Sequence, residues 1–249
     1  MAKNYGKWLG GALGWAFGGP LGALFGFAVG SMFDNTERAP QTQGQQDNYT
    51  RYRHHTTHDD FVMSLLALSA AVMKADGHSK RSELNYIKSF FKSQFGEART
   101  REALSLLKNL LERDIPIKDV AEQIRYNMEH PLRLQLLHYM FNIAKADGHI
   151  HQAEVDVIQK ISVYLGISSK DYESIEGMFY KDVEHAYAVL EITKSASDSE
   201  VKKAYRKMAV KYHPDKVSHL GEEFKSAANE KFLKVKEAYE HIKKERGFV

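Results

Sequence analysis

Apolar residues recur at helical spacing in two stretches of the central part of the chain. In the first stretch successive apolar residues are separated by four, three, four and three positions, and the second stretch, seventy-one residues later, repeats these intervals. The positions are Phe61, Leu65, Leu68, Val72 and Ala75 in the first stretch, and Leu132, Leu136, Tyr139, Ile143 and Ala146 in the second. These intervals place the residues on one face of a helix. The pattern therefore predicts two helices, each with one buried face.

Each apolar stripe leads into nearly the same sequence, KADGHSKRSE from Lys74 and KADGHIHQAE from Lys145. A match at a fixed offset indicates an internal duplication of a helix–turn–helix unit. The glycine after each aspartate can take the left-handed conformation that ends a helix. The glutamate then falls in the opening turn of the next helix, where the dipole favours an acid. Further helices are predicted in EARTREALSLLKNLLE, IKDVAEQIRYNM and SKDYESIEGMFYK, so residues 59–178 form an all-helical domain.

A second helical pattern occupies residues 182–249. The stretch DVEHAYAVLEI predicts a short amphipathic helix, and a longer helix follows with Ser197 or Asp198 as its N-cap and Glu200 in its first turn. The apolar side of the longer helix is formed by Val201, Ala204, Tyr205, Met208, Ala209 and Tyr212. The segment AANEKFLKVKEAYEHI predicts an opposing helix, with Phe232, Val235, Ala238 and Tyr239 facing inward. The two long helices therefore form an antiparallel hairpin.

The sequence KYHPDK lies where the first long helix of this hairpin stops. Pro214 fixes the backbone and moves His213 out of the helical region. No serine or cysteine nucleophile has an obvious position beside the turn, and one His and one Asp across a proline make a poor metal site. The outer surface of the preceding helix is basic, with Lys202, Lys203, Arg206, Lys207 and Lys211. A rigid exposed turn beside a basic helix face suits recognition of an acidic partner surface.

The N-terminal segment follows a different pattern. Residues 8–33 are 26 consecutive residues without a charge, whereas a helix needs about 20 apolar residues to cross a bilayer. The run exceeds the apolar stretch of a secretory signal peptide, which favours a retained anchor. Glycine recurs at every fourth position, at Gly6, Gly10, Gly14, Gly18, Gly22, Gly26 and Gly30. In a bilayer this stripe lets a second helix approach closely. A self-associating transmembrane helix is predicted; the alternatives are a span that does not associate and a hairpin bent at Gly19-Pro20.

Composition and charge indicate a linker and a membrane orientation, and they argue against several classes of function. Residues 34–58 are polar and rich in Gln and Thr, which predicts a flexible tether in which the histidines are solvated. Basic residues after the span slightly outnumber those before it, so the positive-inside rule favours a cytoplasmic C-terminal part. The net charge of +3 over 249 residues does not indicate nucleic-acid binding. The absence of cysteine excludes disulfides, cysteine-ligated zinc and thiol catalysis.

The acids of the two duplicated units are candidates for a metal site. Asp76 and Glu83 in the first unit correspond to Asp147 and Glu154 in the second. If pseudo-symmetry brought them together, their oxygens would suit a hard cation. The pattern does not fit an EF-hand loop, and a turn followed by a capping acid is the favoured interpretation. No metal or other cofactor is therefore predicted. The neighbouring histidines are expected to be exposed turn residues: His78, His149 and His151.

Two segments resemble known domains. The duplicated KADG…E units resemble the TerB-like domain, named after tellurite-resistance proteins, which implies a helical bundle without a defined activity. The segments AYAVLEI, EVKKAYRKMAVKYHPDK and KFLKVKEAYEHI resemble the J-domain of DnaJ/Hsp40 co-chaperones. By this resemblance the basic helix docks on the Hsp70 ATPase domain and the His-Pro-Asp turn triggers ATP hydrolysis. The residues implied are Lys202, Lys203, Tyr205, Arg206, Lys207, Lys211, His213, Pro214, Asp215 and Lys216.

The order of span, TerB-like bundle and C-terminal J-domain resembles the membrane-anchored DnaJ-like protein A (DjlA) type of bacterial co-chaperone. This resemblance implies an Hsp70 (DnaK) partner and a single-pass inner-membrane location, with both soluble domains in the cytoplasm. The sequence thus predicts an all-α co-chaperone that is not itself an enzyme, forms a homodimer through its span and does not bind nucleic acid. The alternative is a membrane-tethered scaffold or metal-responsive sensor built on the TerB-like domain.

Overall fold

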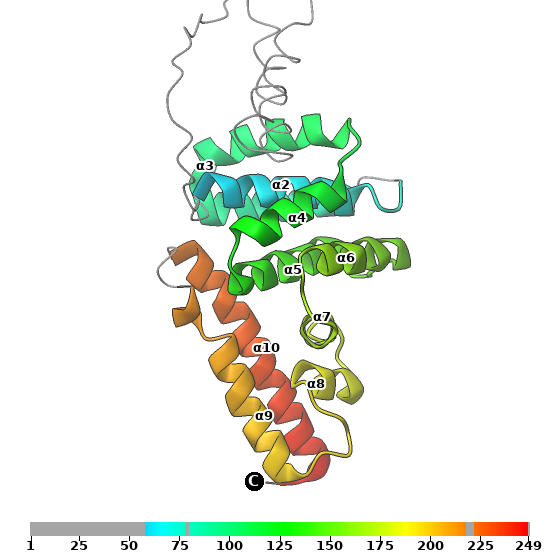
Figure 1. Ribbon diagram of the computed structural model, residues 1–249, viewed down its shortest axis with the longest axis vertical. Coiled ribbons are helices and arrows are strands. Elements are labelled where there is room, and N and C mark those ends of the chain that lie inside the picture. Colours follow the sequence, from blue (N-terminus) through cyan, green and yellow to red (C-terminus); the bar gives the residue numbers. More distant parts are fainter. Residues whose placement is uncertain (1–57, 78–79, 218–221, 249) are drawn as a thin grey trace, which may run out of the picture.

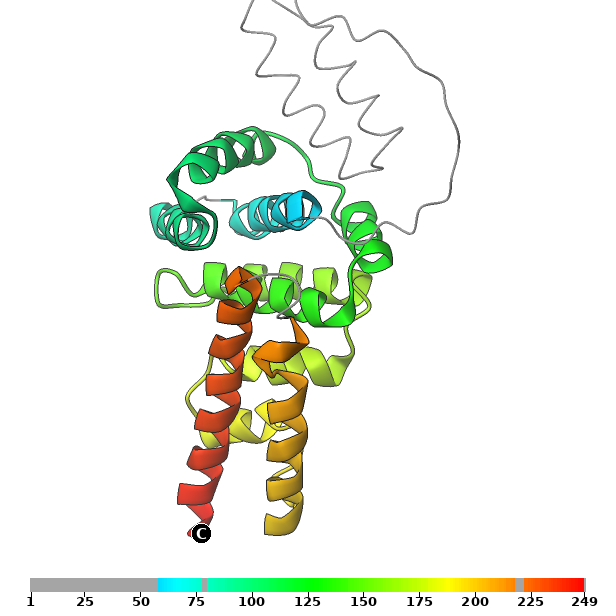
Figure 2. The same ribbon diagram turned by 90° about the vertical axis from the view of Figure 1, so that its left-hand side faces the viewer.

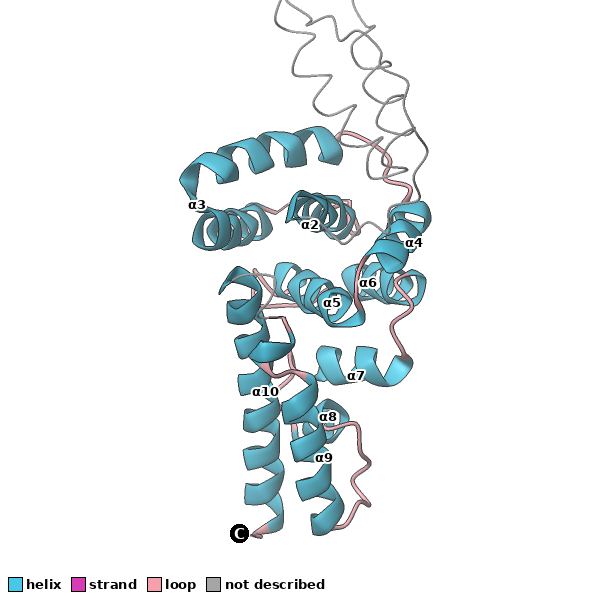
Figure 3. Cartoon of the chain, turned by 60° about the vertical axis from the view of Figure 1, so that its left-hand side comes forward, coloured by secondary structure: helices cyan, strands magenta, loops and turns pink. Residues whose placement is uncertain are grey.

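The computed structural model describes residues 58–77, 80–217 and 222–248, and the chain within these ranges is entirely helical (Figure 3). The elements are α2 (His58–Met73), α3 (Arg81–Leu111), α4 (Ile117–Asn127), α5 (His130–Ala144), α6 (Gln152–Tyr164), α7 (Ser169–Gly177), α8 (Val183–Val189), α9 (Asp198–Lys211), the 3-10 turn η1 (Pro214–Lys216) and α10 (Glu222–Arg246). The predicted all-helical class is confirmed for these ranges.

The predicted membrane span and its glycine stripe lie outside the described residues, as does the predicted tether apart from His58, where α2 begins. No helix in the described ranges combines the length and the apolar character that crossing a bilayer requires.

The described helices are arranged in tiers (Figure 1). One part of α3 lies beside α2 and the other part lies above it, while α5 and α6 form a layer below α2 and α7 and α8 follow on the other side of that layer (Figures 1 and 2). Helices α9 and α10 extend away from the bundle as a long antiparallel hairpin, which Figure 2 shows from the side. The N-terminal part of α10 contacts α5, so the hairpin is joined to the bundle at one end.

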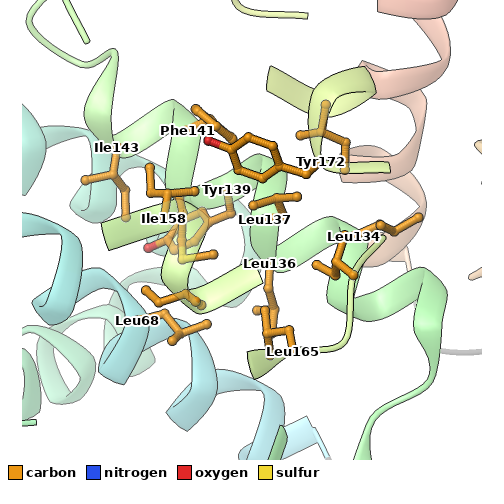
Figure 4. Packing of buried hydrophobic residues seen from close by; sticks show 14 of the residues in the cluster. Leu68, Leu134, Leu136, Leu137, Tyr139, Phe141, Ile143, Ile158, Leu165 and Tyr172 are labelled. Atoms are coloured by element: carbon orange, nitrogen blue, oxygen red, sulfur yellow. The ribbon is translucent and has the colours of Figure 1, made fainter. Parts of the chain in front are cut away.

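The two helices that carry the duplicated stripe are buried on every side rather than on one. Residues 63–73 of α2 and residues 134–141 of α5 are all buried. Helix α2 is covered by α3, α4, α5 and α6, and α5 is covered by α2, α6, α7 and α10 among others. Figure 4 shows side chains of this core, among them Leu68, Leu136 and Ile158, packed into one cluster. The prediction of a single buried face was too narrow because several helices surround each of these two.

The turns of the duplication have the predicted geometry. Gly77 and Gly148 have φ angles of +79° and +94°, the left-handed region that glycine reaches without steric cost. The carboxylate of Glu83 accepts the backbone N–H of Lys80 at 3.4 Å, and that of Glu154 accepts the N–H of His151 at 2.9 Å. Each acid therefore caps the start of its helix, as predicted.

Helix α3 is interrupted at Gly96, whose φ of +78° breaks the helical path. The residues after Gly96 form a second arm, which is the separate helix predicted in EARTREALSLLKNLLE.

The C-terminal hairpin also forms as predicted. Ser197 caps α9, because its Oγ accepts the N–H of Glu200 while the Glu200 carboxylate accepts the N–H of Ser197 at 2.7 Å. Tyr205 is half-buried and stacks on Tyr239 of α10, with ring centroids 4.3 Å apart. The buried positions on this side of α9 are Val201, Ala204, Met208 and Tyr212, and Val235 and Ala238 are buried on the opposing helix.

Candidate functional site

The His-Pro-Asp sequence forms a single 3-10 turn directly after α9. His213 has an extended backbone, with φ −63° and ψ 134°, and its Nδ1 accepts the backbone N–H of Asp215 at 3.3 Å. The imidazole also packs in a T-shaped arrangement with the Phe232 ring on α10, with centroids 5.8 Å apart. The side chains of His213 and Asp215 are 47% and 77% exposed. The turn is therefore fixed by local contacts while its two polar side chains face solvent, as the sequence predicted for His213.

The turn lies at the end of the hairpin that faces the bundle (Figures 1 and 2). Helix α9 runs towards the bundle and ends at η1, which contacts α10. The C-terminus of the chain lies at the opposite tip of the hairpin. A partner that reads the turn must therefore approach close to the surface of the bundle.

The basic residues of α9 differ in their surroundings. Lys203 and Arg206 are exposed. The Nζ of Lys202 lies 5.4 Å from the centre of the Phe248 ring, a cation–π contact at the far end of the hairpin. Lys207 is 67% exposed although its Nζ lies 2.8 Å from the carboxylate of Glu191. Most of this face is therefore open to a partner along its length.

Lys211, nearest to the turn, is the exception among these residues. Its side chain is 22% exposed, and its Nζ donates to the carboxylates of both Asp171 and Glu191. Asp171 belongs to α7 and is buried, and Glu191 follows α8 with its side chain 6% exposed. Sequence reasoning missed both acids, because nothing in their spacing from α9 indicates that the fold brings them to it.

The two acids are charged at neutral pH. Burial by itself would raise the pKa of Asp171, but hydrogen bonds from His130, Lys211 and Ser168 hold it well below its ordinary value. Burial would likewise raise the pKa of Glu191, whereas its bonds from Lys207 and Lys211 lower it. The basic helix is thus in contact with two carboxylates of its own chain.

Elsewhere, all four metal-site candidates surround a single ammonium group. The Nζ of Lys80 lies 3.5 Å from Asp76, 3.8 Å from Glu83, 3.1 Å from Asp147 and 3.8 Å from Glu154. Burial raises the pKa of Glu83 to about 7. Over the described ranges no group of three or more His, Asp or Glu side chains is arranged to hold a metal ion.

The sequence offered the meeting of these four acids only as an alternative to separate capping roles, and it did not identify the lysine between them. Lys80 is not shared by the two units, because the equivalent position is His151. His151 is exposed and lies 3.5 Å from Asp147, and His149 is exposed as well, as predicted. His78 lies outside the described residues.

Family comparisons match three consecutive parts of the chain. The model of the DjlA co-chaperone transmembrane domain matches residues 1–48, that of the tellurite resistance protein TerB matches residues 63–177, and that of the DnaJ domain matches residues 185–246. The three matches follow one another in the order that the sequence resemblance implies.

Individual proteins show the same relationship. The chain is 30% identical to the co-chaperone protein DjlA of Vibrio vulnificus (strain CMCP6), over 76% of this chain and 79% of that protein. It is 26% identical to the co-chaperone protein DjlA of Coxiella burnetii (strain RSA 493 / Nine Mile phase I), over 76% and 78%. A segment is 54% identical to the chaperone protein DnaJ of Fusobacterium nucleatum, over 22% of this chain and 14% of that one. No solved structure matches the chain.

Proposed function

The chain belongs to the DjlA family of J-domain co-chaperones, and from this membership we propose that it stimulates ATP hydrolysis by an Hsp70 partner (DnaK) through its His-Pro-Asp turn. The observation that supports this most directly is the turn itself, in which His213 and Asp215 are exposed while backbone and ring contacts fix their positions. The chain is not an enzyme in this proposal, because hydrolysis takes place in the nucleotide site of the partner.

The basic face of α9 supplies the docking surface in this proposal. Lys203 and Arg206 are exposed along α9, the helix that ends at the turn, with Lys202 and Lys207 on the same helix. A row of positive charges speeds association with an acidic surface and fixes the register of the complex. Docking then places the His-Pro-Asp turn against the partner in one orientation.

Single-turnover ATP hydrolysis by a bacterial Hsp70 tests this function, with the full chain in detergent or lipid nanodiscs. The substitution His213→Gln is expected to abolish stimulation and to leave the circular dichroism spectrum unchanged, because the side chain is exposed. The matched control is His149→Gln, the same change at an exposed turn in the bundle. Equal stimulation by both variants, or none by the unaltered chain with several Hsp70 proteins, contradicts the proposal.

We also propose that the N-terminal segment anchors the protein in the inner membrane, with the helical domains on the cytoplasmic side. The match of residues 1–48 to the DjlA transmembrane domain supports an anchor. The chain has no cysteine, so a single thiol introduced by Tyr126→Cys, at a side chain that is 90% exposed, reports the side of the membrane. A membrane-impermeant maleimide is expected to label this thiol only after spheroplasts are permeabilised. Labelling of intact spheroplasts would place the bundle outside.

The alternative function, a metal-responsive sensor or scaffold built on the TerB-like domain, has no specific observation in its favour. The place that a cation would take among the four acids is filled by the ammonium group of Lys80. Anchoring instead gives the J-domain a defined purpose, since it confines stimulation of the Hsp70 to the membrane surface and raises the local concentration there.

A further inference from the structure

The end of the basic helix nearest the His-Pro-Asp turn is held by acids from outside that helix. Lys211 donates to Asp171 on α7 and to Glu191 after α8, and Lys207 lies 2.8 Å from the same Glu191. Asp171 comes from the TerB-like bundle, whereas Lys211 belongs to the J-domain. The ion pair therefore crosses from one domain to the other.

These contacts occupy the same groups that a partner would use. An ammonium group donates at most three hydrogen bonds, and Lys211 spends two of its bonds on carboxylates while only 22% of its side chain is exposed. An acidic surface can bind this lysine fully only by displacing Asp171 and Glu191. The two intramolecular acids thus resemble, in charge and position, the surface that the basic face is suited to bind.

We propose that Asp171 and Glu191 act as an intramolecular competitor for the basic helix, so that docking of Hsp70 requires Lys207 and Lys211 to exchange these carboxylates for acidic groups of the partner. This inference rests on the function proposed above and adds its regulation. A ligand or client of the bundle that shifts α7 away from α9 would release Lys211 from Asp171, leaving only Glu191 of the J-domain to displace, and would raise the affinity for Hsp70. The TerB-like domain thereby controls the J-domain through one ion pair.

The position of Asp171 is firmly set by its surroundings. Its carboxylate accepts the hydroxyl of Ser168 at 2.7 Å, and the Nε2 of His130 lies 3.4 Å away. Helix α7 is itself fixed against α8, because the hydroxyl of Ser174 donates to the backbone oxygen of Val189 at 2.8 Å. The acid is therefore presented to Lys211 in a fixed place, which makes it an effective competitor.

The backbone of Glu191 points to the same role. Its φ of +58° is in the left-handed region, and among the described residues it is the one non-glycine residue with a positive φ. A side chain in this region crowds its own backbone, which glycine would avoid and asparagine tolerates better. The position nevertheless carries an acid, and its carboxylate binds two lysines of α9. Binding these lysines accounts for an acid at a position that disfavours it.

The test measures stimulation of Hsp70 as a function of the concentration of the full chain. Asp171→Asn and Glu191→Asn remove one charge each with little change in shape, and asparagine suits the backbone at 191. Each substitution is expected to lower the half-maximal concentration by about fivefold or more, in the range of a typical coupling between sites, and the double variant by more. The matched control is Glu173→Gln, which removes a charge from an exposed position of α7 and should change nothing.

The outcomes separate this inference from the proposed function. If the unaltered chain stimulates hydrolysis and both folded variants stimulate it equally or less strongly, the competitor is refuted and the function stands. If nothing stimulates hydrolysis, the function fails, and lysine reactivity then decides the inference. Mass spectrometry after brief acylation should find Lys211 less modified than Lys203 in the unaltered chain and equally modified in the double variant. Equal modification in the unaltered chain would overturn the proposal.

Discussion

Lys231 of α10 is buried against α5, where its Nζ donates to the side-chain oxygen of Gln135. This contact crosses from the J-domain to the TerB-like bundle at the end of the hairpin that carries the His-Pro-Asp turn. The neighbouring His138 is buried as well, and burial together with the charges of Lys231 and Lys234 holds its pKa well below the ordinary value. The junction between the two domains, where α10 meets α5, thus contains a lysine amine that is buried away from water.

The first prediction follows from the titration of this lysine. Burial lowers the pKa of Lys231 from 10.5 to about 7, so between these pH values the unfolded chain binds a proton that the folded chain does not. The free energy of unfolding should therefore rise with pH from about 7 to about 10.5, by on the order of a few kcal/mol. Urea unfolding of the unaltered chain and of Lys231→Met, followed across this range, measures the difference.

The variant Lys231→Met should lack this rise and should be more stable than the unaltered chain at pH 7, because it places no ammonium group in the apolar junction. Lys236→Met, at an exposed position of the same helix, is the matched control and should retain the rise. Parallel pH profiles for the unaltered chain and Lys231→Met would show that the lysine remains protonated in the folded state.

The second prediction concerns the ammonium group between the four acids. The substitution Lys80→Ala leaves Glu83 and Glu154, which are 2% and 1% exposed, without their shared cation. We expect the free energy of unfolding to fall by about 1–3 kcal/mol near pH 8. This is less than for a fully buried ion pair, because Lys80 is 24% exposed. Chemical unfolding compared with Lys88→Ala, an exposed lysine of α3, the helix that begins directly after Lys80, gives this loss.

The loss of unfolding free energy in Lys80→Ala should grow as the pH rises. The pKa of Glu83 in the folded chain is raised to about 7, so stability falls as pH rises from about 4.5 through 7. Without Lys80 the pKa of Glu83 rises further, so the free energy of unfolding continues to decrease to higher pH. Lys80→Ala should therefore be close to the unaltered chain near pH 5 and clearly weaker at pH 8. The same deficit at both values would argue that the lysine acts through packing rather than charge.

The sequence predicted those parts of the fold that depend on residues close together in the chain. The caps at Ser197, Glu83 and Glu154 and the left-handed glycines at Gly77 and Gly148 are all found, because each depends on neighbours within a few positions. The hairpin of α9 and α10 was predicted for a related reason, since its apolar stripes follow the helical period. The exposed turn at His213 follows from the proline beside it.

Contacts between distant segments could not be predicted in this way. Asp171 lies 40 positions before Lys211, and its own surroundings in the sequence identify it as a residue of the first helical turn and nothing more. Lys80 breaks the repeat that identified its four partners. The all-round burial of α2 has the same origin, because the pattern of one helix does not reveal how many others will pack on it.

The third prediction concerns the close packing of α7 against α8. A Cβ added at Gly177 would lie 3.0 Å from the backbone oxygen of His185 and 3.2 Å from Cγ2 of Val189. Because a backbone oxygen in α8 cannot move as a flexible side chain can, Gly177→Ala should lower the free energy of unfolding by about 1 kcal/mol or more, although alanine favours helix. Thermal and urea unfolding check this, with Glu173→Ala on the same helix as control. Unchanged stability would mean that α7 and α8 separate readily.

The last prediction concerns the glycine stripe, which lies outside the described residues and rests on the sequence alone. Gly18 and Gly22 are two of the seven glycines at four-residue spacing, and a smooth stripe lets two helices in a bilayer approach closely. Replacing both with leucine adds bulk on that stripe without reducing the apolar character of the span. We therefore expect the full chain to be a dimer in detergent and the double variant to be largely monomeric, as measured by sedimentation equilibrium.

The segment provides its own control for this experiment. Gly11 and Gly19 are off the stripe, each one position after a stripe glycine. Their replacement by leucine changes composition and helix propensity to the same extent, but it should leave the dimer intact because the added side chains point away from the contact. Equal loss of the dimer in both double variants would show that glycine content rather than the stripe matters. A dimer that persists in both would place its contacts elsewhere in the chain.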